Sequence, residues 1–248
     1  MNNSILVRVA TADDQHYAET ITNEMAESAK ARGTGIARRT PGYICEKMTE
    51  GKAVIATTQD GAWVGFCYIE SWEHEKFVAN SGLIVAPEFR KSGVATQIKH
   101  KVFELSRKKY PEAKIFGLTT GLAVMKINSE LGYEPVTYSE LTTDEQFWKG
   151  CQSCVNYEIL KSKNRKNCMC TAMLYDPAEA AKKQSEKTRV FVNESGEIEK
   201  HKKRELSGNL KLFERWVRFK QFVLAKGWKK EEDAGARKNS LLSVLFFW

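Results

Sequence analysis

The segment from Ser81 to Thr96 constrains the fold of this chain most strongly. It reads as an apolar strand, a basic turn that contains glycine, and the start of a helix. A helix that begins near Ser92 leaves its first backbone N–H groups without intrahelical partners, and they point toward the end of the strand. Together with the positive end of the helix dipole these donors favour an anion. Gly93 lets a ligand approach the backbone, and Arg90 and Lys91 add positive charge. The segment therefore predicts a turn that binds phosphates.

Around this turn, the spacing of apolar residues predicts alternating strands and helices. Asp60-Gly61 indicates a tight hairpin, and Pro41 fits the first turn of a helix. The order is α+β. The predicted elements are a strand at Ile5–Val9, helices at Thr11–Ala31 and Pro41–Met48, strands at Ala53–Thr58, Trp63–Ser71 and Phe77–Val85, a helix at Thr96–Lys109, a strand at Ala113–Thr119, a helix at Leu122–Leu131, a strand from Gly132, a short helix at Asp144–Lys149 and a strand at Cys168–Tyr175.

Two motifs carry a resemblance to a known family. Arg90 to Ala95 resembles the R/Q-x-x-G-x-G/A motif of the GNAT N-acyltransferase superfamily, and Gly132-Tyr133-Glu134 resembles its G-F/Y-E signature. The resemblance covers Ile5 to Asp176. It implies the GNAT fold, which is a mixed, mostly antiparallel sheet flanked by helices, and it implies acetyl-CoA or another short acyl-CoA as co-substrate.

The same resemblance implies which residues hold the acyl-CoA. Its pyrophosphate lies on the turn, and backbone N–H groups of the preceding strand polarise the thioester carbonyl. The implied contacts are Leu83, Ile84, Val85, Arg90, Lys91, Ser92, Gly93, Val94, Ala95, Thr96 and Asn128.

Candidates for proton transfer lie at the end of the second hairpin strand and on the helix before Gly132. Glu70 and Glu75 are the carboxylates placed to act through water as general base, or they are solvated carboxylates at a strand end. Asn128 occupies the position where family members often have a tyrosine that protonates the leaving thiolate. Because an amide is a poor proton donor, Thr119, Thr120, Tyr133 or water would have to take that role.

The acceptor site is predicted around the loop that joins the first two helices. Arginine forks suit carboxylates, so an acidic amino acid is a plausible acceptor, although solvated loop arginines are the alternative. The segments 28–39, 116–121 and 147–154 also resemble a GNAT subgroup that is associated with arginine biosynthesis and acylation of glutamate. The substrate-binding candidates are Arg32, Arg38, Arg39, Thr119 and Thr120.

Four cysteines form two pairs near the end of this region. Cys151-x-x-Cys154 and Cys168-x-Cys170 are separated by thirteen residues. This number and spacing of cysteines is typical of a structural zinc site with four thiolate ligands. The second pair is predicted on a strand with both sulfurs on one face. A redox-sensitive thiol group and merely packed thiols are the alternatives.

Charge divides the chain near Ala181. Residues 182–248 hold 17 of the 39 Lys and Arg and 9 of the 31 Asp and Glu, so they carry the whole net charge of +8. We therefore predict an acyltransferase domain at 1–181 and, at 182–248, a basic linker with an amphipathic helix over 210–224 that docks on the domain, a partner or a membrane surface. No nucleic-acid motif is apparent.

The amino terminus lacks the basic and apolar regions of a signal peptide, and no segment approaches the length that spans a bilayer, so a cytoplasmic protein is expected. The favoured function is an N-acyltransferase that moves an acetyl or succinyl group from CoA to a small amine, with glutamate as the leading acceptor. A homodimer is the assembly that we would test for. A CoA-binding sensor or scaffold without turnover, which uses the C-terminal helix to bind a partner, is the alternative.

Overall fold

The computed structural model describes residues 4–33, 37–188, 191–192 and 198–199. The chain divides into two compact units, residues 1–205 and 206–248, and everything described belongs to the first. The amphipathic helix predicted over 210–224 and residues 34–36 of the predicted acceptor loop lie outside the described residues. No helix within the described part is long and apolar enough to cross a membrane.

The centre of the described unit is a seven-stranded sheet in the order β1-β2-β3-β4-β5-β7-β6. Neighbouring strands are antiparallel except β4 and β5, which run parallel. This confirms the predicted α+β class with a mixed, mostly antiparallel sheet. The strands are β1 (Ile5–Val9), β2 (Ala53–Thr58), β3 (Trp63–Trp72), β4 (Phe77–Val85), β5 (Lys114–Thr119), β6 (Glu134–Val136) and β7 (Thr171–Tyr175). A separate short ribbon joins β8 (Phe191–Val192) to β9 (Ile198–Glu199).

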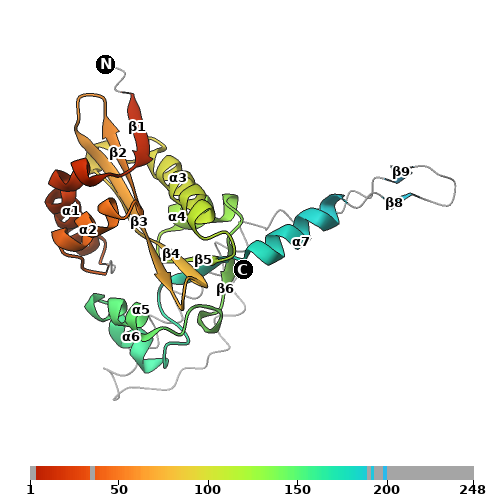
Figure 1. The fold of residues 1–248 in the computed structure, drawn as a ribbon. Helices are drawn as coiled ribbons and strands as arrows, with labels where there is room; N and C mark the ends of the chain where they lie inside the picture. Colours follow the sequence, from red (N-terminus) through yellow and green to blue (C-terminus); the bar gives the residue numbers. More distant parts are fainter. Residues whose placement is uncertain (1–3, 34–36, 189–190, 193–197, 200–248) are drawn as a thin grey trace, which may run out of the picture. The chain divides into compact units, whose positions relative to one another are not determined.

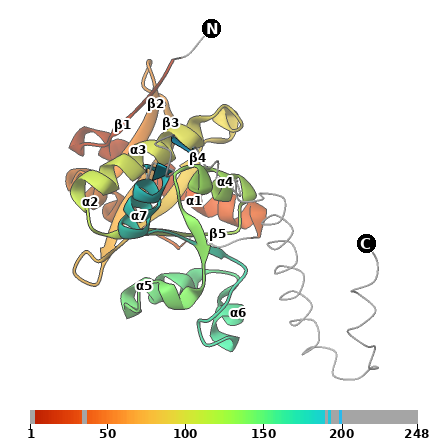
Figure 2. The same cartoon turned by 90° about the vertical axis from the view of Figure 1, so that its right-hand side faces the viewer.

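Helices cover both faces of the sheet. In Figure 1, α1 and α2 lie on one side of the strands and α3 lies on the other. Figure 2 shows α5 and α6 together beyond one end of the sheet. The helices are α1 (Ala18–Arg32), α2 (Pro41–Thr49), α3 (Val94–Lys109), α4 (Leu122–Glu130), α5 (Glu145–Lys149), α6 (Tyr157–Ser162) and α7 (Pro177–Thr188), with 3-10 turns η1 (Ala12–Tyr17), η2 (Pro87–Phe89), η3 (Tyr138–Glu140) and η4 (Gly150–Ser153).

Two apolar clusters on the sheet explain why these segments fold where they do. The first packs Ile21 of α1 and Ile44 of α2 against Phe66 of β3. The second packs Trp148 of α5 and Leu160 of α6 against the middle of β5 and β7. Because all six residues of β2 are buried, that strand is covered on both faces, and its first four residues are apolar.

Several boundaries differ from the sequence prediction. The first helical segment begins as the 3-10 turn η1 and becomes α-helical only at Ala18, and α6 was not predicted. Strand β7 begins at Thr171, so the prediction that Cys168 and Cys170 share a strand face is wrong; both lie in the connection before it. The domain boundary predicted near Ala181 falls inside α7.

The parallel pair β4 and β5 separates part-way along its length. Only three residue pairs join the two strands, and the last is Ala79 with Phe116. From Asn80 onward β4 has no β5 partner among the described residues, so that edge presents unpaired backbone groups. The β3–β4 register also shifts near Gly82, whose φ of 67° is left-handed. The sheet is therefore open beside the strand that leads into the predicted phosphate turn.

Candidate active site

The predicted phosphate turn lies between β4 and α3 and opens directly into the first turn of the helix. Gly93 caps α3 with a φ of 85°, and a Cβ atom built there would meet no atom within 4 Å. The helix begins at Val94, and the first bond back to the cap comes from the N–H of Gln97 to the carbonyl of Gly93. The backbone N–H groups of the first helical turn, before Gln97, have no such bond and are therefore free to bind an anion. Lys91 and Ser92 are exposed beside them.

Arg90 holds this turn against α1. Its Nε donates to the carbonyl of Val85 at 3.1 Å, and its Nη2 lies 2.7 Å from both Glu24 Oε1 and Ser28 Oγ. Most of its donors are thus engaged inside the protein. Arg90 fixes the position of the phosphate turn, and the neighbouring Lys91 carries the side-chain charge that is open to a ligand.

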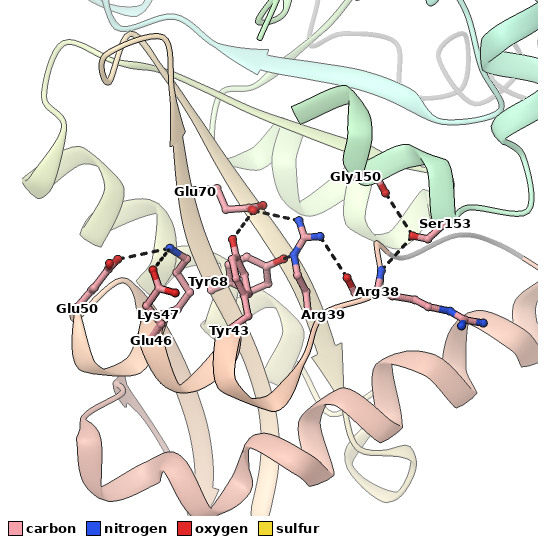
Figure 3. Close-up of polar contacts among 10 residues, drawn as sticks. All are labelled: Arg38, Arg39, Tyr43, Glu46, Lys47, Glu50, Tyr68, Glu70, Gly150 and Ser153. Carbon is pink, nitrogen blue, oxygen red and sulfur yellow. Dashed lines mark hydrogen bonds and ion pairs between the residues drawn. The ribbon is translucent and has the colours of Figure 1, made fainter. Parts of the chain in front are cut away.

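A buried carboxylate lies on β3, on the sheet face that α2 covers. Glu70 is 7% exposed, and its Oε1 accepts hydrogen bonds from Arg39 Nη2 at 3.0 Å and Tyr43 OH at 2.5 Å (Figure 3). Burial, followed by the charge of Glu70, raises the pKa of Tyr43, which keeps its hydroxyl a donor. Within the described residues no hydrogen bond ends on Oε2 of Glu70. That oxygen is therefore the one left for a water or an ammonium group.

Arg39 is the only one of the three predicted acceptor arginines that reaches Glu70 in the described structure. Its Nε donates to Tyr68 OH at 2.9 Å and its Nη1 to the carbonyl of Arg38 at 3.3 Å. Burial alone would lower its pKa, but Tyr68 and Glu70 outweigh that effect and raise it. Since a guanidinium has five donors, two stay available. Arg32 and Arg38 are exposed, and Figure 3 shows the Arg38 side chain pointing away from Glu70.

Comparison with known proteins finds a family model that matches this region. Residues 36–123, which include Arg39, Glu70 and the turn at Gly93, match the model of the acetyltransferase (GNAT) family. The matched segment, about a third of the chain, is similar to the GNAT acetyltransferases. A search of curated proteins found no match.

Solved structures with a similar fold share little sequence with the GNAT segment and its surroundings. Rv2747 from Mycobacterium tuberculosis in complex with CoA and NLQ is 16% identical with a TM-score of 0.50, covering 69% of this chain and 98% of that one. N-acetylglutamate synthase from Neisseria gonorrhoeae is 15% identical with a TM-score of 0.49, and the match covers 71% of this chain but 36% of that one. Phosphinothricin acetyltransferase from Sinorhizobium meliloti is 14% identical with a TM-score of 0.47, covering 69% and 88%. The likeness to the Mycobacterium protein supports the fold described above.

Other predicted residues of the GNAT site lie around the opening between β4 and β5. Asn128 on α4 is buried, donates through Nδ2 to Met173 Sδ at 3.7 Å, and has no partner for its Oδ1 among the described residues. Thr119 ends β5 and accepts the N–H of Gly121, and Thr120 follows it. Tyr133, a candidate acid, is buried and donates to Asn80 Oδ1 at 2.9 Å.

Glu75, the second candidate base, lies in the turn between β3 and β4. It is exposed and has a φ of 67°. The neighbouring Glu73 is engaged, because its Oε1 accepts hydrogen bonds from the backbone and side chain of Thr143 and from Thr142. The structure thus separates the two candidate bases: Glu70 is buried in a hydrogen-bonded cluster, whereas Glu75 faces solvent.

The four clustered cysteines fall in two connections. Cys151 is within η4, Cys154 follows it, and Cys168 and Cys170 precede β7. None of the four forms a disulfide. Within the described residues, no group of three or more His, Cys, Asp or Glu side chains stands in a metal-binding arrangement. The predicted zinc cage is therefore not preformed. Of the other two thiols, Cys67 is buried and Cys45 is half-buried against the first apolar cluster.

Sequence reasoning did not identify Tyr43 and Tyr68 as site residues. Tyr43 is on α2 and Tyr68 on β3, and their rings meet edge to face with centroids 5.8 Å apart. Both hydroxyls join the Glu70 and Arg39 cluster. In the sequence, Tyr68 alternates with Glu70, which places both on one face of the strand; this is the signal that could have found it.

A cavity of about 580 Å³ lies elsewhere, between α1 and the connection after β4. Tyr17, Glu24, Trp63 and Pro87 are among its lining residues, but neither Glu70 nor Gly93 is. The chemistry of the turn and the buried carboxylate therefore does not belong to that cavity.

Proposed function

We propose that this protein is an acyl-CoA-dependent N-acyltransferase that acts on a small primary amine. One observation carries the proposal. The Gly93 turn, which can bind an anion, follows the unpaired edge of β4, and that edge runs back from the turn toward the buried carboxylate of Glu70. The turn would bind the pyrophosphate of CoA through backbone N–H groups. The open edge of β4, from Asn80 to Val85, would pair with the amide groups of the pantetheine arm, as an added strand does.

The chemistry needs three groups at the inner end of that edge. A backbone N–H of β4 polarises the thioester carbonyl, and the carboxylate of Glu70 accepts a proton from the ammonium group through a water on Oε2. The neutral amine then attacks the carbonyl carbon, the C–S bond breaks, and the attacking nitrogen loses its second proton to solvent as the amide forms. The thiolate of CoA leaves and takes a proton from solvent, because the amide of Asn128 is a poor proton donor.

We further propose an acidic amino acid, with glutamate the leading candidate, as the acceptor. Two donors of Arg39 are open beside Glu70, and a guanidinium fork suits a carboxylate. The same cluster offers a carboxylate for the amine. An amino acid, which carries both charges, fits that pairing. The narrower sequence resemblance to glutamate acylation supports the same choice.

Binding of CoA tests the turn independently of turnover. We expect Gly93→Glu to abolish the CoA-dependent rise in thermal stability, because a carboxylate would occupy the anion site; a ligand at 100 times its Kd stabilises by about 2.7 kcal/mol. Gly33→Glu is a matched control, since Gly33 also has a positive φ and open space around its Cβ position. Equal CoA stabilisation of both variants would contradict the assigned turn.

A further inference from the structure

Two turns that are distant in sequence bring four thiols together. Cys168 belongs to the second apolar cluster, and Cys151 is half-buried against the same cluster. Tyr138 is also in this cluster, and its hydroxyl donates to the carbonyl of Cys170 at 2.9 Å. The pairing of these turns has no role in the proposed acyl transfer.

The backbone around the first pair is arranged to support sulfur ligands. The N–H of Cys154 donates to the carbonyl of Cys151 at 3.0 Å, which closes the C-x-x-C turn. The N–H of Asn156 then donates to Cys154 Sγ at 3.4 Å, while the carbonyl of Asn156 lies 3.8 Å from Cys168 Sγ. Hydrogen bonds from backbone N–H groups favour the thiolate over the thiol, and such outer contacts orient metal ligands.

We propose that Cys151, Cys154, Cys168 and Cys170 bind one zinc ion as four thiolate ligands. Zinc prefers four sulfur ligands in tetrahedral arrangement at structural sites. Binding exchanges four S–H protons for four Zn–S bonds, so four protons are released and the site acquires a net charge of −2. Lys163 and Lys166 lie on the connection between the two pairs and would offset part of that charge, whereas Arg165 is paired with Glu145.

Metal binding would have to draw the two cysteine connections together. Within the described residues, the four thiols do not stand in a metal-binding arrangement. Metal binding that displaces protons is coupled to local folding. Cys151, Cys154 and Cys170 are only partly buried, which gives an ion access.

The position of this cluster connects it to the acceptor side of the active site. Ser153 Oγ accepts the N–H of Arg38 at 3.2 Å, and a Cβ atom at Gly150 would lie 3.8 Å from Arg39 Nη2 (Figure 3). Zinc would therefore fix the turn that supports Arg39. Resting on the proposed function, this part of the inference predicts that metal loss raises the KM for the amine acceptor more than the KM for acyl-CoA.

Metal content tests the site without reference to activity. The full chain, purified without a polyhistidine tag and reconstituted with Zn²⁺, is measured by elemental analysis beside Cys154→Ser, Cys168→Ser and the control Cys45→Ser. We expect one zinc per chain in the wild type and in Cys45→Ser, and near-complete loss in the other two. No bound zinc in the wild type, or equal zinc in all four proteins, would overturn the proposal.

A second measurement on the wild type alone covers the case in which a cysteine variant fails to fold. Alkylation of the native protein, read by peptide mass, should spare the four clustered cysteines with Zn²⁺ and modify them after chelation, while Cys45 reacts in both. Cobalt should substitute with a thiolate charge-transfer band. Alkylation that is independent of metal, or a disulfide within the cluster in the purified protein, would refute zinc binding.

Discussion

The two oxygens of the Glu70 carboxylate have different surroundings. Arg39 and Tyr43 both bond to Oε1, and the other oxygen is left for a water or the acceptor amine. The two bonds fix the orientation of the carboxylate, so Glu70 is suited to hold an ammonium group or the water that takes its proton. Glu70 and Glu75 are both glutamates at one end of the same hairpin, but we expect only Glu70 to contribute to catalysis.

We expect Glu70→Gln to lower kcat by on the order of 10²-fold, the usual contribution of a positioned general base. Affinity for CoA should be unchanged, because the phosphate turn is on a different element. Glu75→Gln is the matched control and should behave as wild type, since its side chain is exposed in the β3–β4 turn. Steady-state thiol release measures both. Equal loss in the two variants, or none in either, would contradict the role of Glu70.

At this scale the sequence predicted the residues with strong local signals and missed those defined by packing. Gly93 is identifiable because a left-handed cap before a helix favours glycine. Glu70 is identifiable as a carboxylate near a strand end. Tyr43 is on another element, and its contact with Glu70 depends on how α2 packs on β3, which no local pattern encodes. For the same reason, the sequence could not distinguish among the three candidate arginines, and only the structure shows that Arg39 is the one that contacts Glu70.

At the scale of elements, two glycines have positive φ for different reasons. Gly82 is at the irregularity of β4, where a Cβ would overlap the ring of Tyr68 and lie 2.9 Å from Met25 Cε. Gly93 is at the start of α3, where the same atom would meet open space. The first position is therefore restricted by backbone conformation and packing, and the second by backbone conformation alone.

We expect Gly93→Ala to lower the free energy of unfolding by about 1–2 kcal/mol, the cost of left-handed backbone for a residue with a Cβ. Gly82→Ala should cost about 3 kcal/mol or more, because the overlap with Tyr68 adds to that strain. Urea unfolding of the two variants measures the difference. If Gly82→Ala were the milder change, the close packing of α1 on the bulge would be wrong.

The strand–turn–helix from β4 to α3 and the hairpin from β2 to β3 agreed with the sequence because alternation, turn glycines and helix periodicity are local. Pro41 likewise stands at the start of α2, where Thr40 accepts the N–H of Tyr43 at 3.2 Å. The cysteine connection was harder to predict. A C-x-C pair fits a strand by spacing, but β7 begins only at Thr171, after both cysteines.

At the scale of the whole molecule, one ion pair ties the first strand to the segment that follows it. Asp14 is buried and receives two bonds of 2.7 Å from Arg8 and one of 2.8 Å from the N–H of Thr11. The bonds from Arg8 outweigh burial and lower the pKa of Asp14. A lowered pKa in the folded state contributes stability above the unfolded pKa of about 4, and that stability is lost as the pH falls through the folded value.

We expect Asp14→Asn to reduce the free energy of unfolding at pH 7 by about 1–2 kcal/mol, a modest value because Arg8 is partly exposed and screened by solvent. The difference from wild type should shrink as the pH is lowered below about 4. Asp13→Asn is the control on the exposed side of the same turn. Denaturant unfolding across pH measures this, and a difference that grows in acid would contradict the assigned pairing.

The central claim is that the phosphate turn and the Glu70 cluster act together to move an acyl group to an amine. The most direct test incubates the full chain with acetyl-CoA or succinyl-CoA and a panel of amino acids, and follows free thiol together with the mass of the product. We predict thiol release that requires an acidic amino acid, yields its N-acyl derivative, and disappears in Gly93→Glu. Binding of CoA with no acceptor-dependent thiol release for any amine would contradict the claim and favour a CoA-binding protein without turnover.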